Sequence, residues 1–275
     1  VDETALVLWA LWEHYQKYRA IEFVRKLYRK LIVPCADFMV SFRHEETRLP
    51  APSWNLWEDR RGIHTFTCAT VVAGLRAAAN FARLFAEKER AWIYETAATE
   101  ITEAMRNHLY SREKGRFLRA LQFYSDDYYD ADTTIDASLF GTFYLGVFDA
   151  NDEMVAGTMK AVEKHLWIQT KIGGVARFET DEYMRVSGDV TGNPWFICTL
   201  WLADYRIAVA KSKKDLRGAL EILEWTAKRA LPSGVLAEQV SPLTGEPVSV
   251  SPLTWSHSTF VATVMNYLRK LEELQ

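Results

Sequence analysis

The sequence predicts an all-α fold in which helical hairpins are arranged in a ring. Apolar residues recur every three or four positions through most of the 275 residues, which is the period of an amphipathic helix. Alternation of apolar and polar residues, which would indicate half-buried strands, is almost absent. Short and long connections alternate between the predicted helices, as expected for hairpins with tight turns at one end and elaborated loops at the other.

About nine helices follow from this periodicity. The first covers residues 4–18 and has Leu8 and Trp12 on its apolar face. The second begins near residue 20 and should kink or end at Pro34. The later helices share the same pattern and are expected over residues 65–87, 93–109, 134–148, 153–168, 194–210, 213–230 and 256–273. Pro194 suits a first helical turn, and no linker divides the chain, so residues 1–275 are predicted to form a single domain.

The composition limits the partners of this chain. The 33 Lys and Arg residues nearly balance the 36 Asp and Glu residues, and the net charge of −3 gives no reason to expect a nucleic acid or an anionic membrane surface. The longest apolar stretches are well short of the ~20 residues that a membrane span needs. Aromatic residues reach 13 %, with 10 Trp, and they are costly to expose unless they form a core or line a site.

No sequence motif indicates a metal or a cofactor, and we expect neither. The six His residues form no HExxH pair, and no GxGxxG, P-loop or GxSxG motif occurs. An acidic run lacks the spacing of an EF-hand and is interpreted as a solvated loop; it consists of Asp126, Asp127, Asp130 and Asp132. The cysteines are expected to be free thiols, which favours a reducing compartment such as the cytoplasm; they are Cys35, Cys68 and Cys198.

Three long connections, residues 47–63, 173–193 and 231–255, are the places to look for chemistry. The first contains Glu58 and Asp59 directly after Trp57. A carboxylic acid against indole rings loses hydration, which raises its pKa and suits it to act as a general acid. The alternative is that these acids pair with Arg60 or Arg61.

The other two connections offer a guanidinium and an isolated acid. Arg177 could donate forked hydrogen bonds to sugar hydroxyls if Glu179 or Asp181 orients it, or it could belong to a surface ion-pair cluster. Glu238 has no adjacent Lys or Arg, so its carboxylate is either exposed to solvent or held for use.

Seven segments, taken in order along the whole chain, resemble the glucoamylases of glycoside hydrolase family 15. The clearest are Leu-Trp-Glu-Asp-Arg at 56–60, Gly-Val-Ala-Arg-Phe-Glu at 174–179, Leu-Ala-Glu-Gln at 236–239 and Leu-Thr-Trp-Ser-His at 253–257. The others lie at 1–5, 136–139 and 192–201, and residues 65–67 extend the first motif. The resemblance implies an (α/α)6 toroid and an inverting, exo-acting enzyme that releases β-glucose from the non-reducing ends of α-glucans.

The same resemblance implies residue roles. Glu58 falls on the family's general acid and Glu238 on its general base, and Ser249 matches a serine that supports the base. The remaining positions are implied to bind the oligosaccharide or α-glucan substrate; they are Trp57, Asp59, Arg177, Asp181 and Trp255.

The chain also departs from the family pattern. Asn55 stands where the family more often has Asp, and nothing precedes Val1 that corresponds to the family's first helix pair or to the N-terminal β-sandwich of prokaryotic relatives. We therefore expect a C-terminal portion of the catalytic domain, an incomplete toroid whose partner is that N-terminal region and which could be inactive without it. The alternatives are a glucodextranase or trehalase of the same family, or a non-catalytic carbohydrate-sensing module on the same fold.

Overall fold

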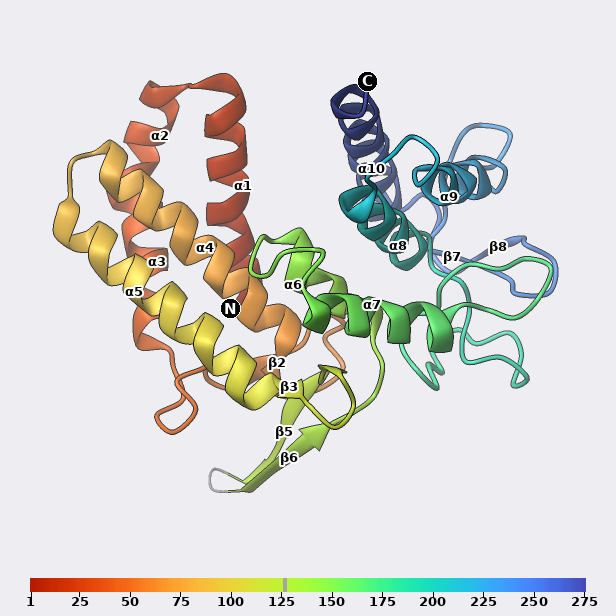
Figure 1. The fold of residues 1–275 in the computed structure, drawn as a ribbon, viewed down its shortest axis with the longest axis horizontal. Helices are drawn as coiled ribbons and strands as arrows, with labels where there is room; N and C mark the ends of the chain where they lie inside the picture. The colour runs from red at the N-terminus through yellow and green to blue at the C-terminus, as the bar shows by residue number, and fades with distance from the viewer. Residues whose placement is uncertain (126–127) are drawn as a thin grey trace. The chain divides into compact units, whose positions relative to one another are not determined.

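The computed structural model describes residues 1–125 and 128–275, and it divides into two compact units that are described separately here (Figure 1). Unit 1 consists of Val1–Thr133 and Leu145–Phe148, and unit 2 of Thr134–Tyr144 and Asp149–Gln275. The single domain over residues 1–275 stays a prediction. Asp126 and Asp127, half of the acidic run noted above, lie outside the described residues.

Unit 1 is built around a buried helix. Its helices are α1 (Asp2–Tyr18), α2 (Ile21–Leu27), α3 (Val33–Ser41), α4 (Thr65–Leu84) and α5 (Lys88–Ala104). The Ala-rich α4 is buried along most of its length and packs against α1 and α5 (Figure 1). Gly74 permits this close packing, because a Cβ at that position would lie 2.9 Å from the backbone of Ala5 in α1.

The helix that was expected to kink or end at Pro34 instead continues past it. A π-helical segment, η1 (Tyr28–Ile32), joins α2 to α3, and Pro34 lies in the first turn of α3, where a missing N–H costs little. A second π-helical segment, η2 (Met105–Leu109), extends α5 to the end that the periodicity predicted.

Unit 1 also contains strands, so the prediction of an almost strand-free chain is wrong here. The strands are β1 (Ser53–Trp54), β2 (Arg61–His64), β3 (Tyr110–Ser111), β4 (Arg116–Phe117), β5 (Ala120–Ser125) and β6 (Tyr128–Asp132). A four-stranded antiparallel sheet has the order β1-β2-β5-β6, and β3 pairs with β4. Strands of two to six residues are too short for a clear alternation of apolar and polar positions.

Unit 2 contains the remaining helices. They are the 3-10 helix η3 (Ala137–Phe140), α6 (Gly141–Tyr144), α7 (Glu153–Leu166), α8 (Phe196–Val209), α9 (Arg217–Ala227) and α10 (Thr254–Glu273). Two short strands, β7 (Gln239–Val240) and β8 (Pro247–Val248), pair antiparallel. A small core brings together Phe196 at the start of α8, Trp225 of α9 and Leu236 of the segment before β7.

Three helix predictions in unit 2 need correction. The helix expected over residues 134–148 is reduced to η3 and α6, because Asp136 is extended, pairs with Phe178 and caps η3, and Gly146 has a positive φ of 69°. The helix α8 begins after Pro194 rather than at it, because Trp195 is extended and pairs with Gln239. The helix α9 begins at Arg217 rather than near residue 213.

The described residues contain the thiols as expected: Cys35, Cys68 and Cys198 are all free. In the part of the chain that the structure describes, no helix combines the length and apolar character needed to cross a membrane. In that same part, no group of three or more His, Cys, Asp or Glu is arranged to hold a metal ion.

A buried histidine makes unit 1 sensitive to acid. Burial, with the charge of Arg119 as the second cause, lowers the pKa of His64 to about 4. The neutral ring is therefore favoured in the folded state. Its contribution to the free energy of unfolding is fully present above pH 6.5 and is lost as the pH falls through about 4. We expect unit 1 to lose about 3 kcal/mol over this range and His64→Phe to remove that loss, measured by hydrogen exchange of the α4 amides. An equal loss in the variant would contradict the assignment.

A buried carboxyl gives unit 2 the opposite response. Burial raises the pKa of Asp204 on α8 to about 6, although Thr263 and Asn266 on α10 donate hydrogen bonds to it at 2.9 and 3.0 Å. The folded state keeps this proton longer than the unfolded chain, so unit 2 should lose about 3 kcal/mol as the pH rises from about 4 to about 6. Asp204→Asn should abolish this loss, measured by hydrogen exchange of the α8 amides between pH 4 and 7. Persistence of the slope in Asp204→Asn would show that another group causes it.

Candidate active site

Glu58 lies in a tight turn between β1 and β2. The backbone N–H of Glu58 donates to the carbonyl of Asn55 at 3.0 Å, and Asn55 N–H donates to the carbonyl of Arg60 at 3.0 Å. Glu58 has a φ of 56°, a left-handed conformation that is uncommon for a residue with a side chain. Backbone outliers of this kind cluster at functional sites, so the turn is a candidate for one.

The buried amide of Asn55 closes this turn. Its Nδ2 donates to Asp59 Oδ1 at 2.7 Å, and its Oδ1 accepts from the backbone N–H of Asp59 at 3.0 Å. Arg60 Nε also lies 3.5 Å from Asp59 Oδ1, so one of the two acids is paired with a neighbouring arginine. Asn55, which stands where the resembled pattern more often has Asp, thus has a neutral amide that can both donate a hydrogen bond to Asp59 and accept one from it.

A cavity of about 710 Å³ in unit 1 opens beside Glu58. Its lining combines apolar side chains and the indole of Trp54 with charged and polar groups such as Glu3, Ser53 and Arg61. Trp54 is 59 % exposed, so its ring is available to a ligand, while Trp57 is half-buried. Carboxyl, hydroxyl and guanidinium groups around an exposed indole suit a polyhydroxylated ligand with apolar faces.

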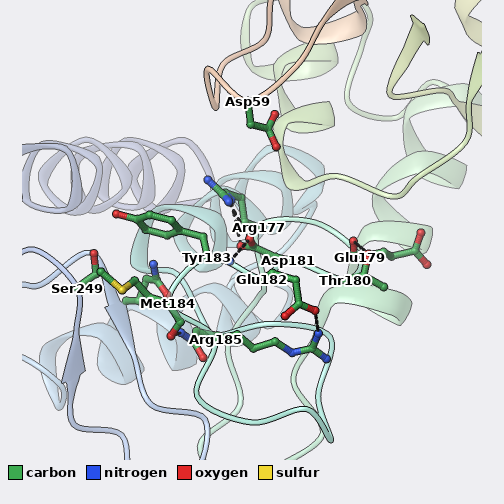
Figure 2. A network of polar contacts seen from close by, with 12 residues as sticks. Asp59, Arg177, Glu179, Thr180, Asp181, Glu182, Tyr183, Met184, Arg185 and Ser249 are labelled. Atoms are coloured by element: carbon green, nitrogen blue, oxygen red, sulfur yellow. Dashed lines mark hydrogen bonds and ion pairs between the residues drawn. The ribbon is translucent and has the colours of Figure 1, made fainter.

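Arg177 in unit 2 is held by a carboxylate and by aromatic rings. Its Nε and Nη2 donate to Asp181 Oδ2 and Oδ1 at 3.0 and 2.7 Å. Figure 2 shows Arg177 beside Asp181 with dashed lines for this contact. The guanidinium also lies over the rings of Phe178, Tyr183 and Trp195, at 4.7, 5.3 and 4.9 Å. Of the two acids proposed to orient this arginine, the structure selects Asp181, which is 1 % exposed. The forked pair fixes the guanidinium plane, and its planar donors suit recognition of oxygen atoms.

Glu238 is held by two donors from unit 2. Ser249 Oγ donates to Glu238 Oε2 at 2.5 Å, and Gln239 Nε2 donates to the same oxygen at 3.2 Å. Ser249 has a φ of 66°, so a second strained residue lies in direct contact with a predicted site residue. These two hydrogen bonds hold Oε2 of Glu238 in place.

Trp255 lies in the first turn of α10 and is 36 % exposed. Its ring centroid lies 5.8 Å from that of Trp201 at an interplanar angle of 59°, and Trp201 stacks on Phe140 at 3.9 Å. These aromatic contacts fix the indole of Trp255 while leaving part of its surface open.

The predicted site residues fall into two groups. Trp57, Glu58 and Asp59 belong to unit 1, and the others, Arg177, Asp181, Glu238, Ser249 and Trp255, belong to unit 2. Asn193 and Gln239 were not predicted as functional residues, yet both are buried and their amides are hydrogen-bonded to each other at 2.8 Å. The signal for Asn193 was its position between Gly192 and Pro194, before an expected helix.

The chain matches a known protein family. The model of the family "Glycosyl hydrolases family 15" matches residues 1–265. The chain is 28 % identical over 273 residues to an uncharacterised glycosyl hydrolase of Methanocaldococcus jannaschii, covering 96 % of this chain and 41 % of that protein. It is 27 % identical to a glucoamylase of a Clostridium species, over 86 % of this chain and 35 % of that protein. It is 24 % identical to a trehalase of Mycolicibacterium smegmatis, over 81 % of this chain and 31 % of that protein.

Among solved structures, a bacterial glucoamylase complexed with acarbose matches with a TM-score of 0.80 at 24 % identity, over 98 % of this chain and 41 % of that one. The predicted fold class, the (α/α)6 toroid of such glucoamylases, is confirmed by this likeness. The chain spans less than half the length of these relatives.

Proposed function

Because this chain belongs to family 15 of the glycosyl hydrolases, we propose that it forms the C-terminal portion of the catalytic domain of an inverting, exo-acting glucoamylase. The enzyme would release β-glucose from the non-reducing ends of α-1,4 and α-1,6 glucans. The observation that carries the proposal is the strained turn that presents Glu58 beside an open cavity with an exposed indole. The glucoamylase among the relatives supports the choice of substrate.

In this proposal Glu58 is the general acid. Its carboxyl proton passes to the glycosidic oxygen while the bond from that oxygen to the anomeric carbon breaks. The leaving part of the substrate departs with a hydroxyl group at the former glycosidic oxygen. The anomeric carbon develops positive charge, and water attacks that carbon. The turn closed by Asn55 and Asp59 supports this role because it fixes the backbone that carries the acid.

Glu238 is the proposed general base. It removes a proton from the water that attacks the opposite face of the sugar, so that the new C–O bond forms with inversion. Such an enzyme holds its two carboxyl groups roughly 6.5–9.5 Å apart, which leaves room for that water. The donors Ser249 and Gln239 support the assignment, because a base must be ionised before it accepts a proton.

The remaining predicted residues bind substrate in this proposal. The guanidinium of Arg177, fixed by Asp181, donates to sugar hydroxyls, and Asp59 accepts from one. The indoles of Trp57 and Trp255 pack against the apolar faces of the sugar rings. We expect no metal and no cofactor, since a proton donor, a base and water complete the reaction.

The stereochemistry of the product tests the proposal. Proton NMR during the first minutes of maltotriose hydrolysis should show β-glucose appearing before mutarotation produces the α anomer. If α-glucose appears first, the water does not attack from the face opposite the leaving group, and the acid–base pair proposed here is wrong.

The partner that we propose is the rest of the longer protein, an N-terminal region with a β-sandwich and the first helix pair. The M. jannaschii relative is more than twice as long as the aligned part, which supports this. The helix α10 exposes Val261, Met265 and Leu268, one turn apart on one stripe, and such a stripe suits a further helix. The three free thiols support a reducing compartment, the cytoplasm.

A trehalase is the second candidate, because trehalases occur among the relatives. Rates on maltotriose, isomaltose and trehalose separate the possibilities: a glucoamylase prefers maltotriose, a glucodextranase isomaltose and a trehalase trehalose. A carbohydrate-sensing module would bind maltotriose without cleaving it.

A further inference from the structure

A line of buried amides in unit 2 ends at the proposed base. Asn193 Nδ2 donates to Gln239 Oε1 at 2.8 Å, and Gln239 Nε2 donates to Glu238 Oε2 at 3.2 Å. Asn193 is 1 % exposed and Gln239 is fully buried, so water does not compete for these amides. Ser249 Oγ donates to the same oxygen of Glu238.

Backbone pairing brings the two amides together. The carbonyl of Pro194 accepts from the N–H of Val240 at 3.0 Å, and the N–H of Phe196 donates to the carbonyl of Glu238 at 3.3 Å. Trp195 pairs with Gln239 in the same antiparallel arrangement. The segment before α8 therefore runs beside the strand that follows Glu238, although 46 residues separate Asn193 from Gln239.

Two backbone groups decide which way the amide of Asn193 is oriented. The N–H of Val186 can only donate, and it donates to Asn193 Oδ1 at 3.0 Å. The carbonyl of Met184 can only accept, and it accepts from Asn193 Nδ2 at 2.8 Å. A flipped Asn193 would place donor against donor and acceptor against acceptor, so the side-chain nitrogen must face Gln239.

The orientation of the Asn193 amide determines the orientation of the Gln239 amide. Since Asn193 presents an N–H to Gln239, the amide oxygen of Gln239 must face Asn193 and its NH2 group must face Glu238. We propose that Asn193 is a positioning residue, which keeps the amide of Gln239 in the orientation that donates a hydrogen bond to Glu238. In the other orientation, the oxygen of Gln239 would face the carboxylate and repel it.

The inference rests on the proposed role of Glu238 as the base, and it defines what Asn193 contributes to that role. A donor favours the ionised carboxylate, and an acceptor in its place favours the protonated one. Asn193 therefore acts on the protonation of Glu238 without touching the substrate.

A double-mutant cycle tests the inference. The set is Asn193→Leu, Gln239→Leu and the double variant, with Asn266→Leu as the matched control, because Asn266 also donates to a buried carboxylate in unit 2. Leucine is uncharged and has the same branched arrangement of side-chain heavy atoms as asparagine, so no new charge acts on Glu238. Carbon-13 NMR of labelled glutamate carboxyls follows the protonation of Glu238 directly and needs no turnover.

We expect Asn193→Leu to move the midpoint of Glu238 protonation upward by about one pH unit, and Asn266→Leu to leave it in place. The acid limb of the kcat profile should move equally, with KM changed less than about twofold. In the Gln239→Leu background, Asn193→Leu should have no further effect. If Asn193→Leu does not fold, Asn193→Ala, which adds no bulk, is expected to give the same shift.

Two results would overturn the inference: an unchanged midpoint in a folded Asn193 variant, or the same shift with and without Gln239. Failure of the proposed function is separate, because it would appear as full hydrolysis in Glu238→Gln while the NMR cycle still reports on Asn193.

Discussion

Replacing Glu58 with glutamine is expected to lower kcat for maltotriose by about 10³-fold. Glutamine keeps the size of the side chain and its place in the turn, but its amide has no acidic proton to give to the leaving oxygen. KM should change little, because the change removes an interaction made only in the transition state. Steady-state hydrolysis of maltotriose by the protein, together with a binding titration of maltose, measures both quantities.

A matched control is Glu113→Gln, which makes the same change at an exposed position of the β3–β4 turn. That variant should keep the kcat of the parent protein. If Glu58→Gln also kept it, Glu58 would not be the acid, and a non-catalytic sugar-binding module would become the better account. Substrates with a good leaving group, such as an aryl glucoside, should lose less activity in Glu58→Gln, since they need less help from an acid.

Replacing Glu238 with glutamine is expected to lower kcat by a similar factor, about 10³. Here the aryl glucoside should give no relief, because activation of water is impaired whatever the leaving group is. The same substrate pair thus distinguishes the acid from the base. The measurement is the ratio of kcat values on maltotriose and on the aryl glucoside for each variant.

Ser249→Ala tests the proposed base by a smaller change, which keeps the carboxylate of Glu238. It removes one charge-assisted hydrogen bond to Glu238, whose loss should lower kcat by about tenfold. The acid limb of the kcat profile of Ser249→Ala should shift to higher pH, because the carboxylate of Glu238 has lost a hydrogen-bond donor. If Ser249→Ala lost as much activity as Glu238→Gln, the serine would have a role of its own beyond support of the carboxylate.

The long amphipathic helices were predictable from the sequence, and the short elements were not. A stripe such as that of α4 or α10 repeats over five turns, so the period is clear. The strand β1 pairs with β2, and β2 also pairs with β5, a contact between residues far apart in the sequence. The apolar residues 134–148 look helical, but the cap at Asp136 and the bridge to Phe178 depend on a distant loop.

The candidate site was predictable where the family resemblance implied a role for a residue. Ser249 and Asp181 were assigned through the family resemblance, and their bonds to Glu238 and Arg177 are present in unit 2. Asn193 was missed because its local signal, the position between Gly192 and Pro194, does not show which groups its amide contacts. Its orientation depends on backbone groups seven and nine residues earlier and on an amide 46 residues later.

The most direct measurement is an experimental structure of the protein with an unreactive oligosaccharide bound. We expect the carboxyl groups of Glu58 and Glu238 to lie roughly 6.5–9.5 Å apart, on opposite faces of one glucose ring, with a water beside Glu238. A ligand bound elsewhere, with the two glutamates opening onto separate surfaces, would contradict the proposal that they act as one catalytic pair.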